Sequence, residues 1–216
     1  MSPETEPTTQ PTFAEYLDGY LPDDEMLLAA RARADELGCR TVAPAVGSTL
    51  RFLTATLGAR AVVEIGTGAG VSGLYLLHGM AQDGVLTSID IEPEFHRAAR
   101  TTFADAGFGG SRTRLIMGRA VDVLPRLTSG GYDLVFVDAA RPEYPHYYEQ
   151  GVELLRPGGV IVFNDIFAQG RLSEPTRRDQ DTLALREVAR SVAADERLMP
   201  AMLPVSGGLL AASRLA

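Results

Sequence analysis

The stretch Ala61-Val-Val-Glu-Ile-Gly-Thr-Gly-Ala-Gly70 combines a short apolar run, one acid and three alternating glycines. A buried parallel strand reads as a nearly continuous apolar run, so residues 61–65 are predicted to form one, with Glu64 at its mouth. The glycines let the backbone turn tightly and approach a ligand closely. Helical patterning follows from Val71. A strand, a glycine turn and a helix together predict a nucleotide-type pocket.

Strands and helices alternate along the rest of the chain. We predict further strands at 85–90, 113–117, 132–138, 159–164, 198–203 and 209–212. Residues 204–208 are expected to join the last two strands as a hairpin. This alternation predicts an α/β fold: a Rossmann-like, seven-stranded, mostly parallel sheet with helices on both faces and a C-terminal antiparallel hairpin.

The first sixty residues have a different pattern. Residues 1–12 are polar and contain several prolines, which is typical of a disordered tail. Helices are predicted at 23–37 and 44–57, after a shorter helical piece that begins at Phe13. We therefore expect a single domain over 13–216, made of N-terminal helices (13–58) and a Rossmann-like core (59–216).

Composition limits the classes of function. The 216 residues include 45% hydrophobic and 22% charged residues, as in ordinary globular proteins. The net charge of −8 argues against nucleic acid as an obligatory partner, although a local basic patch stays compatible with it. Cys39 is the only cysteine, which excludes an intrachain disulfide and suits a reducing compartment. With no signal-peptide pattern and no run long enough to span a bilayer, we expect a cytoplasmic protein without a membrane partner.

Asp90 and Ala120, which both follow the glycine turn in the sequence, are candidates for nucleotide contacts. Asp90 ends the second strand about twenty residues after the turn, the spacing expected of a carboxylate that binds ribose hydroxyls. A solvated acid at a strand end is the alternative. Ala120 follows the third strand, where a small residue would let an adenine ring lie flat against the chain.

Oxygen-bearing side chains end the fourth and fifth strands. Asp138 follows one, and the pair Asn164-Asp165 follows the other. Because neighbouring strands lie about 4.8 Å apart, these oxygens could converge on one hard divalent cation. Alternatively, Asp138 holds the cofactor or caps a helix, and the pair begins a turn.

Several segments in the same order resemble the bacterial members of the catechol and caffeoyl-CoA O-methyltransferase family, which use S-adenosylmethionine. The resemblance extends roughly from Thr41 to the end of the chain. It rests on the segments 62–72, 88–93, 136–148 and 155–162, and on Pro44-Ala-Val-Gly47 before the first strand. It implies S-adenosylmethionine as cofactor and a small hydroxylated, aromatic molecule as methyl acceptor.

The resemblance also assigns site residues and an assembly. It implies that the cofactor site is formed by Val42, Glu64, Gly66, Thr67, Gly68, Ser72, Asp90, Ile91, Ala120 and Asp138. It implies that Asp138, Asn164 and Asp165 ligate a divalent cation, usually Mg²⁺. Family members of this type commonly pair through their N-terminal helices, so we expect a homodimer.

Two positions depart from the family pattern. Members usually have Asp-Asn where this chain has Asn164-Asp165, and side chains alternate faces along a strand, so the exchange alters which oxygen points at a metal. Both ligand types survive the exchange, and two carboxylates can still reach the metal if the chain has left regular strand geometry there. Arg141 stands where the family has a catalytic lysine. A guanidinium stays protonated, so Arg141 could position an anion or stabilise a phenolate, but it could not remove a proton. A solvated loop arginine is the alternative.

The expected catalytic set is Asp138, Arg141 and His146. A cation bound to the acceptor hydroxyl would lower the pKa of that hydroxyl, and water or His146 would take the proton. His146 is a candidate because histidine titrates near neutral pH, although it could equally be an ordinary loop residue. Three tyrosines could form an aromatic wall for a flat substrate or pack against the sheet: Tyr144, Tyr147 and Tyr148.

Two other functions stay open at this point. Arg141 and the exchanged pair would also suit an S-adenosylmethionine-binding protein that has lost catalysis. An NAD-dependent oxidoreductase is disfavoured, because Val71 replaces the third glycine of the dinucleotide fingerprint and no Tyr-x-x-x-Lys pair is present.

Overall fold

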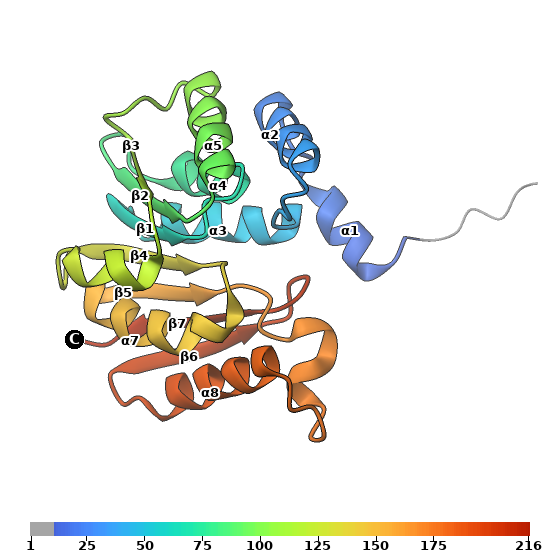
Figure 1. Ribbon diagram of the computed structural model, residues 1–216, viewed down its shortest axis with the longest axis vertical. Helices are drawn as coiled ribbons and strands as arrows, with labels where there is room; N and C mark the ends of the chain where they lie inside the picture. The colour runs from blue at the N-terminus through green and yellow to red at the C-terminus, as the bar shows by residue number, and fades with distance from the viewer. Residues whose placement is uncertain (1–10) are drawn as a thin grey trace, which may run out of the picture.

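The computed structural model describes residues 11–216 and contains a seven-stranded sheet in the order β3-β2-β1-β4-β5-β7-β6 (Figure 1). Strands β1 to β5 are parallel, and β7 is antiparallel to both β5 and β6. The strands are β1 (Ala61–Ile65), β2 (Val85–Asp90), β3 (Thr113–Met117), β4 (Tyr132–Val137), β5 (Leu155–Phe163), β6 (Leu198–Leu203) and β7 (Leu209–Arg214). The predicted fold is confirmed, and the strand order reverses between β1 and β4, where ligands of such sheets bind.

Helices cover both faces of this sheet. Helices α2 to α5 pack on one face and α6 to α8 on the other, while α1 packs on α3. Figure 1 shows α2, α4 and α5 grouped apart from α7 and α8. The helices are α1 (Phe13–Tyr20), α2 (Glu25–Glu36), α3 (Pro44–Thr56), α4 (Val71–Gly79), α5 (Pro93–Asp105), α6 (Ala120–Val123), α7 (Tyr144–Leu154) and α8 (Gln180–Ala194), with 3₁₀ turns η1 (Leu124–Arg126), η2 (Arg141–Glu143) and η3 (Ala168–Ser173).

Alternation along β1 decides which side chain faces which layer. Val62 packs with the α2–α5 layer, whereas Val63 and Ile65 pack with the α6–α8 layer. Because side chains alternate along a strand, Glu64 shares the side of Val62 and lies under α4. The acid is thereby placed in the core, under the helix that follows the glycine turn.

The bounds of several elements differ from the prediction, most of all those of β5. Strand β5 begins at Leu155, ahead of the predicted start at 159, because the chain already pairs with Tyr132 there before an irregularity shifts the register. Of the predicted tail, residues 1–10 lie outside the described residues. Thr12 is the N-cap of α1, in a reciprocal capping box with Glu15.

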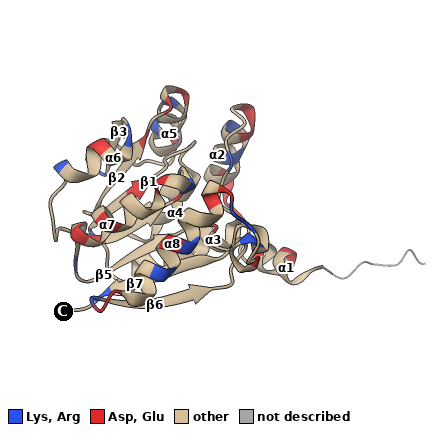
Figure 2. Ribbon diagram, turned by 60° about the horizontal axis from the view of Figure 1, so that its bottom comes forward, with Lys and Arg blue, Asp and Glu red and all other residues tan. Residues whose placement is uncertain are grey.

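Charges are spread over the helical exterior. Figure 2 shows acidic and basic residues interspersed along α2 and α5. Within residues 11–216, none of the helices has both the length and the apolar character needed to cross a membrane.

Candidate functional site

Backbone pairing continues beyond the carboxyl ends of the central strands. The N–H of Gly66 donates to the carbonyl of Ile89, that of Asp138 to Ile65 and that of Asn164 to Val137, each at 2.9 Å. The segments that follow β1, β4 and β5 are therefore held in register at one edge of the sheet. Two adjoining cavities open along this edge.

Gly66 lets two of these segments approach closely. Its φ is +96°, and a Cβ at this position would lie 2.0 Å from the carbonyl oxygen of Asp138. Only glycine accommodates both the conformation and the approach. Gly70, with φ of +90°, then serves as N-cap of α4. The glycine turn therefore allows the tight turn predicted for it and a close approach of two backbone segments.

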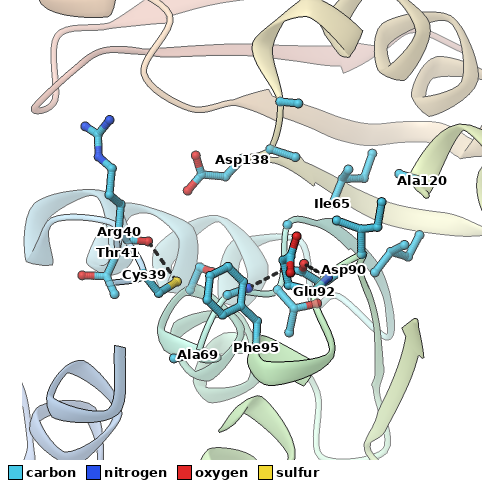
Figure 3. A pocket seen from close by; sticks show the side chains of 18 of the residues that line it. Cys39, Arg40, Thr41, Ile65, Ala69, Asp90, Glu92, Phe95, Ala120 and Asp138 are labelled. Carbon is cyan, nitrogen blue, oxygen red and sulfur yellow. Dashed lines mark hydrogen bonds between the residues drawn. The ribbon is translucent and has the colours of Figure 1, made fainter. Parts of the chain in front are cut away.

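The first cavity, of about 500 Å³, lies over this turn (Figure 3). It gathers residues from the ends of β1, β2 and β4, the start of α6 and the segment before α3. Of the residues predicted to hold the cofactor, those that line it are Val42, Gly66, Thr67, Gly68, Ser72, Asp90, Ile91, Ala120 and Asp138. We call it the cofactor cavity.

Asp90 connects the turn to the start of α5. Its Oδ2 accepts from the N–H of Gly68 at 2.9 Å, and its Oδ1 accepts from the N–H of Glu92 at 2.9 Å (Figure 3). Each carboxylate oxygen keeps a second lone pair. Asp90 can therefore hold the loop and still accept hydrogen bonds from a ligand in the cavity.

Of the residues predicted to form the cofactor site, Glu64 does not line the cofactor cavity. It is fully buried beneath the cavity, where Oε1 accepts from the Ser72 hydroxyl at 2.6 Å and Oε2 from the Ser88 hydroxyl at 2.5 Å. Burial raises the pKa of Glu64 to about 8, against the opposing effect of these two hydrogen bonds. Its contact with the cavity is thus indirect, through Ser72.

A segment that sequence reasoning largely missed, residues 38–43, forms a wall of both cavities. Arg31 of α2 holds it: one guanidinium nitrogen donates to the Thr41 hydroxyl at 2.8 Å and to the Val42 carbonyl at 2.7 Å. Arg31 also pairs with Asp23. Only Val42 was predicted here, because nothing in the local sequence connects an arginine on α2 with a site built around β1.

The second cavity, of about 610 Å³, adjoins the first and has a more polar wall. The two share Arg40, Asp138 and the residues next to them. Its remaining wall comes from η2, the exit of β5, α8 and the turn between β6 and β7, where Ser206 and Gly207 reach the site. We call it the acceptor cavity. The contribution of the hairpin turn was not predicted.

The acceptor cavity contains an ionic cluster. The guanidinium of Arg141 donates to the carboxylate of Asp165 and lies 3.3 Å from a carboxylate oxygen of Asp181. The Arg141 side chain is 18% exposed, so solvent screens the cluster only in part. Asp165 has φ of +51°, which shows that the chain has left strand geometry where β5 ends. Arg141 is therefore held by partners rather than free in a loop.

This cluster bears on the predicted cation site. One oxygen of Asp165 accepts from Arg141. The other lies so close to Gly207 that a Cβ on residue 207 would be 2.2 Å from it. A divalent cation about 4 Å from the guanidinium would be repelled by roughly 8 kcal/mol at an effective dielectric constant of about 20. The donor set of Asp138, Asn164 and Asp165 does not fit a divalent cation in this arrangement.

Asp138 is the acid common to both cavities. Burial and the nearby Asp165 carboxylate raise the pKa of Asp138, while Asn164, Arg141 and Arg40 oppose the rise. The sequence contains no lysine, so all twenty of its Lys/Arg residues are arginines and no lysine can serve as a base in place of a carboxylate. Asp138 is thus a titratable carboxyl at the boundary where two ligands would meet.

The predicted histidine and the three predicted tyrosines do not all reach the cavities. His146 is exposed on α7 and lines neither cavity, so the geometry gives no support to its predicted role as a base. Tyr144 lines the acceptor cavity and packs on Phe163, and Tyr147 lines the cofactor cavity. Tyr148 instead donates to Asp195 at 2.7 Å, which makes it a packing residue.

Comparison with known proteins identifies the family. The profile described as "O-methyltransferase" matches residues 24–215, nearly the whole chain. The chain belongs to the O-methyltransferase family. A protein from Mycobacterium avium (strain 104), named as a candidate O-methyltransferase, is 51% identical over 211 residues, 98% of this chain and 95% of the relative. This membership favours methyl transfer over the NAD-dependent alternative.

Solved structures, an O-methyltransferase among them, share the fold. A protein from Corynebacterium glutamicum superposes with a TM-score of 0.87 at 32% identity, covering 93% of this chain and 94% of that one. The O-methyltransferase TomG from Streptomyces achromogenes, involved in tomaymycin synthesis and solved with S-adenosylmethionine, has a TM-score of 0.86 at 27% identity, covering 93% and 94% of the two chains.

Proposed function

We propose that this O-methyltransferase uses S-adenosylmethionine to methylate a hydroxyl group of a small, aromatic acceptor. The observation that carries the proposal is that a cofactor-sized cavity and a second cavity meet at Asp138. The chain's family and the S-adenosylmethionine in TomG support the choice of cofactor.

The residues around the cofactor cavity have separate tasks in this proposal. Gly66 and Gly68 allow the backbone to approach the ligand, Asp90 accepts hydrogen bonds from ribose hydroxyls, and Ala120 leaves room for the adenine ring. The cofactor supplies a methyl group on a positively charged sulfur; as oxygen bonds to that carbon, the carbon–sulfur bond breaks and its electron pair stays on sulfur. The protein therefore has mainly to align the acceptor oxygen and remove its proton.

We assign proton removal to Asp138. A phenol with a pKa near 10 keeps its proton at neutral pH, so the reaction needs a base close to the hydroxyl. The raised pKa of Asp138 brings this carboxylate nearer to neutral pH, where a general base is most effective. Arg141 cannot act as the base, and His146 lies outside both cavities.

The experiment measures cofactor binding and turnover separately. Calorimetry with S-adenosylmethionine tests the cofactor cavity, and release of S-adenosylhomocysteine with a panel of catechols, phenols and hydroxycinnamates tests transfer. Asp138→Asn should lose at least about 100-fold in turnover, far more than it loses in cofactor affinity. Full turnover in that variant refutes its role as base. Cofactor binding without turnover on any acceptor supports the binding-protein alternative.

We also propose a homodimer formed through the N-terminal helices. Large apolar side chains are exposed on α1 and α3, including Phe13, Tyr16, Tyr20 and Phe52. Exposed apolar groups gathered on neighbouring helices are typical of interfaces. Light scattering tests the assembly, and a monomer mass over a range of concentrations refutes it. The cytoplasm stays the expected compartment, on the basis of the single, unpaired Cys39.

A further inference from the structure

The acceptor cavity contains a fixed positive charge, the guanidinium of Arg141. This side chain and its two acidic partners come from three separate elements. Arg141 comes from η2 after β4, Asp165 from the exit of β5 and Asp181 from the first turn of α8. Helix α8 packs against η2, which brings Asp181 to the guanidinium. The positive charge is therefore fixed by the tertiary structure rather than by one flexible loop.

The orientation of Asp165 depends on the hairpin turn. Asp165 has left-handed backbone geometry, and one of its oxygens fits against Gly207, where any larger residue would collide. The N–H groups of Ile166 and Phe167 donate to the carbonyls of Gly208 and Gly207 at 3.1 and 2.9 Å. This support aims the second oxygen of Asp165 at Arg141. Asp165 is thus held from two sides, by its own backbone geometry and by the close contact with Gly207.

We propose that the guanidinium of Arg141 takes the place of a divalent cation in the acceptor cavity, so that this enzyme transfers methyl groups without an added metal. The inference rests on the function proposed above and deepens it. A guanidinium stays charged at every working pH and has five N–H donors, more than its two carboxylate partners need. Arg141 lines the cavity, so a remaining donor can stabilise the negative charge that develops on the acceptor oxygen. Asp165 and Asp181 are positioning residues for it.

This arrangement gives one physical reason for both departures from the family pattern. An aspartate at 165, rather than at 164, supplies the carboxylate that meets Arg141. An arginine at 141, rather than a lysine, has a planar set of N–H donors that can form ionic contacts with two acids at once. Each departure alone would resemble a defect, but together they make an ion pair inside the site.

The first test uses the wild-type protein after removal of metal. Turnover of catechol is measured with EDTA and with Mg²⁺, and Mn²⁺ binding is measured by electron paramagnetic resonance. We expect rates that agree within about twofold in the two buffers and no Mn²⁺ bound at about 100 μM. Loss of turnover in EDTA with recovery in Mg²⁺ overturns the proposal, as does Mn²⁺ binding at one ion per chain.

The second test removes the charge. Arg141→Met keeps much of the side-chain stem, and we expect kcat/KM in EDTA to fall about 100-fold, as when a donor to a developing anion is lost. With the guanidinium gone, the freed carboxylates should bind Mn²⁺, whereas wild type should not. Arg60→Met is the matched control, because among residues 11–216 the Arg60 guanidinium pairs only with Asp83, on the exposed surface. Unchanged turnover in Arg141→Met refutes the proposed role.

Positioning by α8 can be measured separately. Asp181→Asn should lower kcat about tenfold and leave KM for S-adenosylmethionine unchanged; an unchanged kcat refutes a positioning role for this carboxylate. If Arg141→Met fails to fold, as judged by thermal unfolding, Mn²⁺ binding by wild type still decides the question. If wild type binds the cofactor but methylates nothing, the proposed function fails. In that case a gain of Mn²⁺ binding in Arg141→Met still supports Arg141 as the occupant of the cation site.

Discussion

The buried carboxyl of Glu64 predicts an unusual dependence of stability on pH. Its pKa is raised from 4.5 to about 8 in the folded protein, chiefly by burial, and the carboxylates of Asp138 and Asp90 act in the same direction. Between these two values the folded state holds a proton that the unfolded chain releases. The stabilisation is therefore complete below pH 4.5 and is lost as the pH rises toward 8.

The size of the effect follows from the two pKa values. Each pKa unit is worth about 1.4 kcal/mol, so this one group should lower the free energy of unfolding by roughly 3–4 kcal/mol between pH 5 and pH 8. Replacing Glu64 with glutamine removes the titration and keeps the shape. Because the hydroxyls of Ser72 and Ser88 can accept as well as donate hydrogen bonds, the amide can still pair with both.

Urea unfolding at several pH values compares wild type with Glu64→Gln, so that all other titrating groups cancel. We expect the stability of wild type to fall relative to the variant by roughly 3–4 kcal/mol over this range. Glu149→Gln is the matched control, because Glu149 is exposed on α7 and should follow wild type. Curves for wild type and Glu64→Gln that stay parallel from pH 5 to pH 8 would show that Glu64 is not held neutral.

Three further substitutions test the geometry of the cofactor cavity. Gly66→Ala should reduce affinity for S-adenosylmethionine at least about 100-fold by calorimetry, because the new Cβ would displace the backbone at Asp138; near-normal affinity would contradict the close approach. Asp90→Asn should weaken binding about tenfold or more, since a charge-assisted hydrogen bond is worth about 1.5–3 kcal/mol, and an unchanged dissociation constant would exclude a direct contact. Tyr148→Phe should leave that constant unchanged while lowering the free energy of unfolding by about 1 kcal/mol through loss of the bond to Asp195; weaker cofactor binding would place Tyr148 in the site after all.

The parts of the site that could be predicted from sequence are those encoded locally. The glycine turn, Asp90 and Asp138 follow apolar strands directly, and the carboxyl ends of parallel strands meet at one edge of a sheet. The position of Glu64 was also accessible, because alternation along β1 puts it on the side of Val62 and Ser72 offers it a hydroxyl eight residues later. Its supposed place in the cofactor wall came from the family pattern rather than from the strand.

The parts that could not be predicted depend on contacts between distant segments. Arg31 holds residues 38–43 against the cavities, and Gly207 supports Asp165 from the far end of the chain. Neither position has a local pattern that differs from an ordinary surface arginine or an ordinary turn glycine. The partners of Arg141 belong to the same class, since Asp181 lies forty residues away in sequence.

The two cavities therefore differ in how they are built, and the difference bears on specificity. The cofactor cavity is made mostly of strand ends, whose positions are fixed by the ladder of backbone hydrogen bonds. The acceptor cavity is closed by η2, the β5 exit, α8 and the β6–β7 turn, and loops of this kind can change without disturbing a sheet. Asp138 is the acid at the junction, held by the ladder on one side and facing the Arg141 cluster on the other. A change of acceptor can thus arise in the loops while the position of the base relative to the cofactor stays fixed.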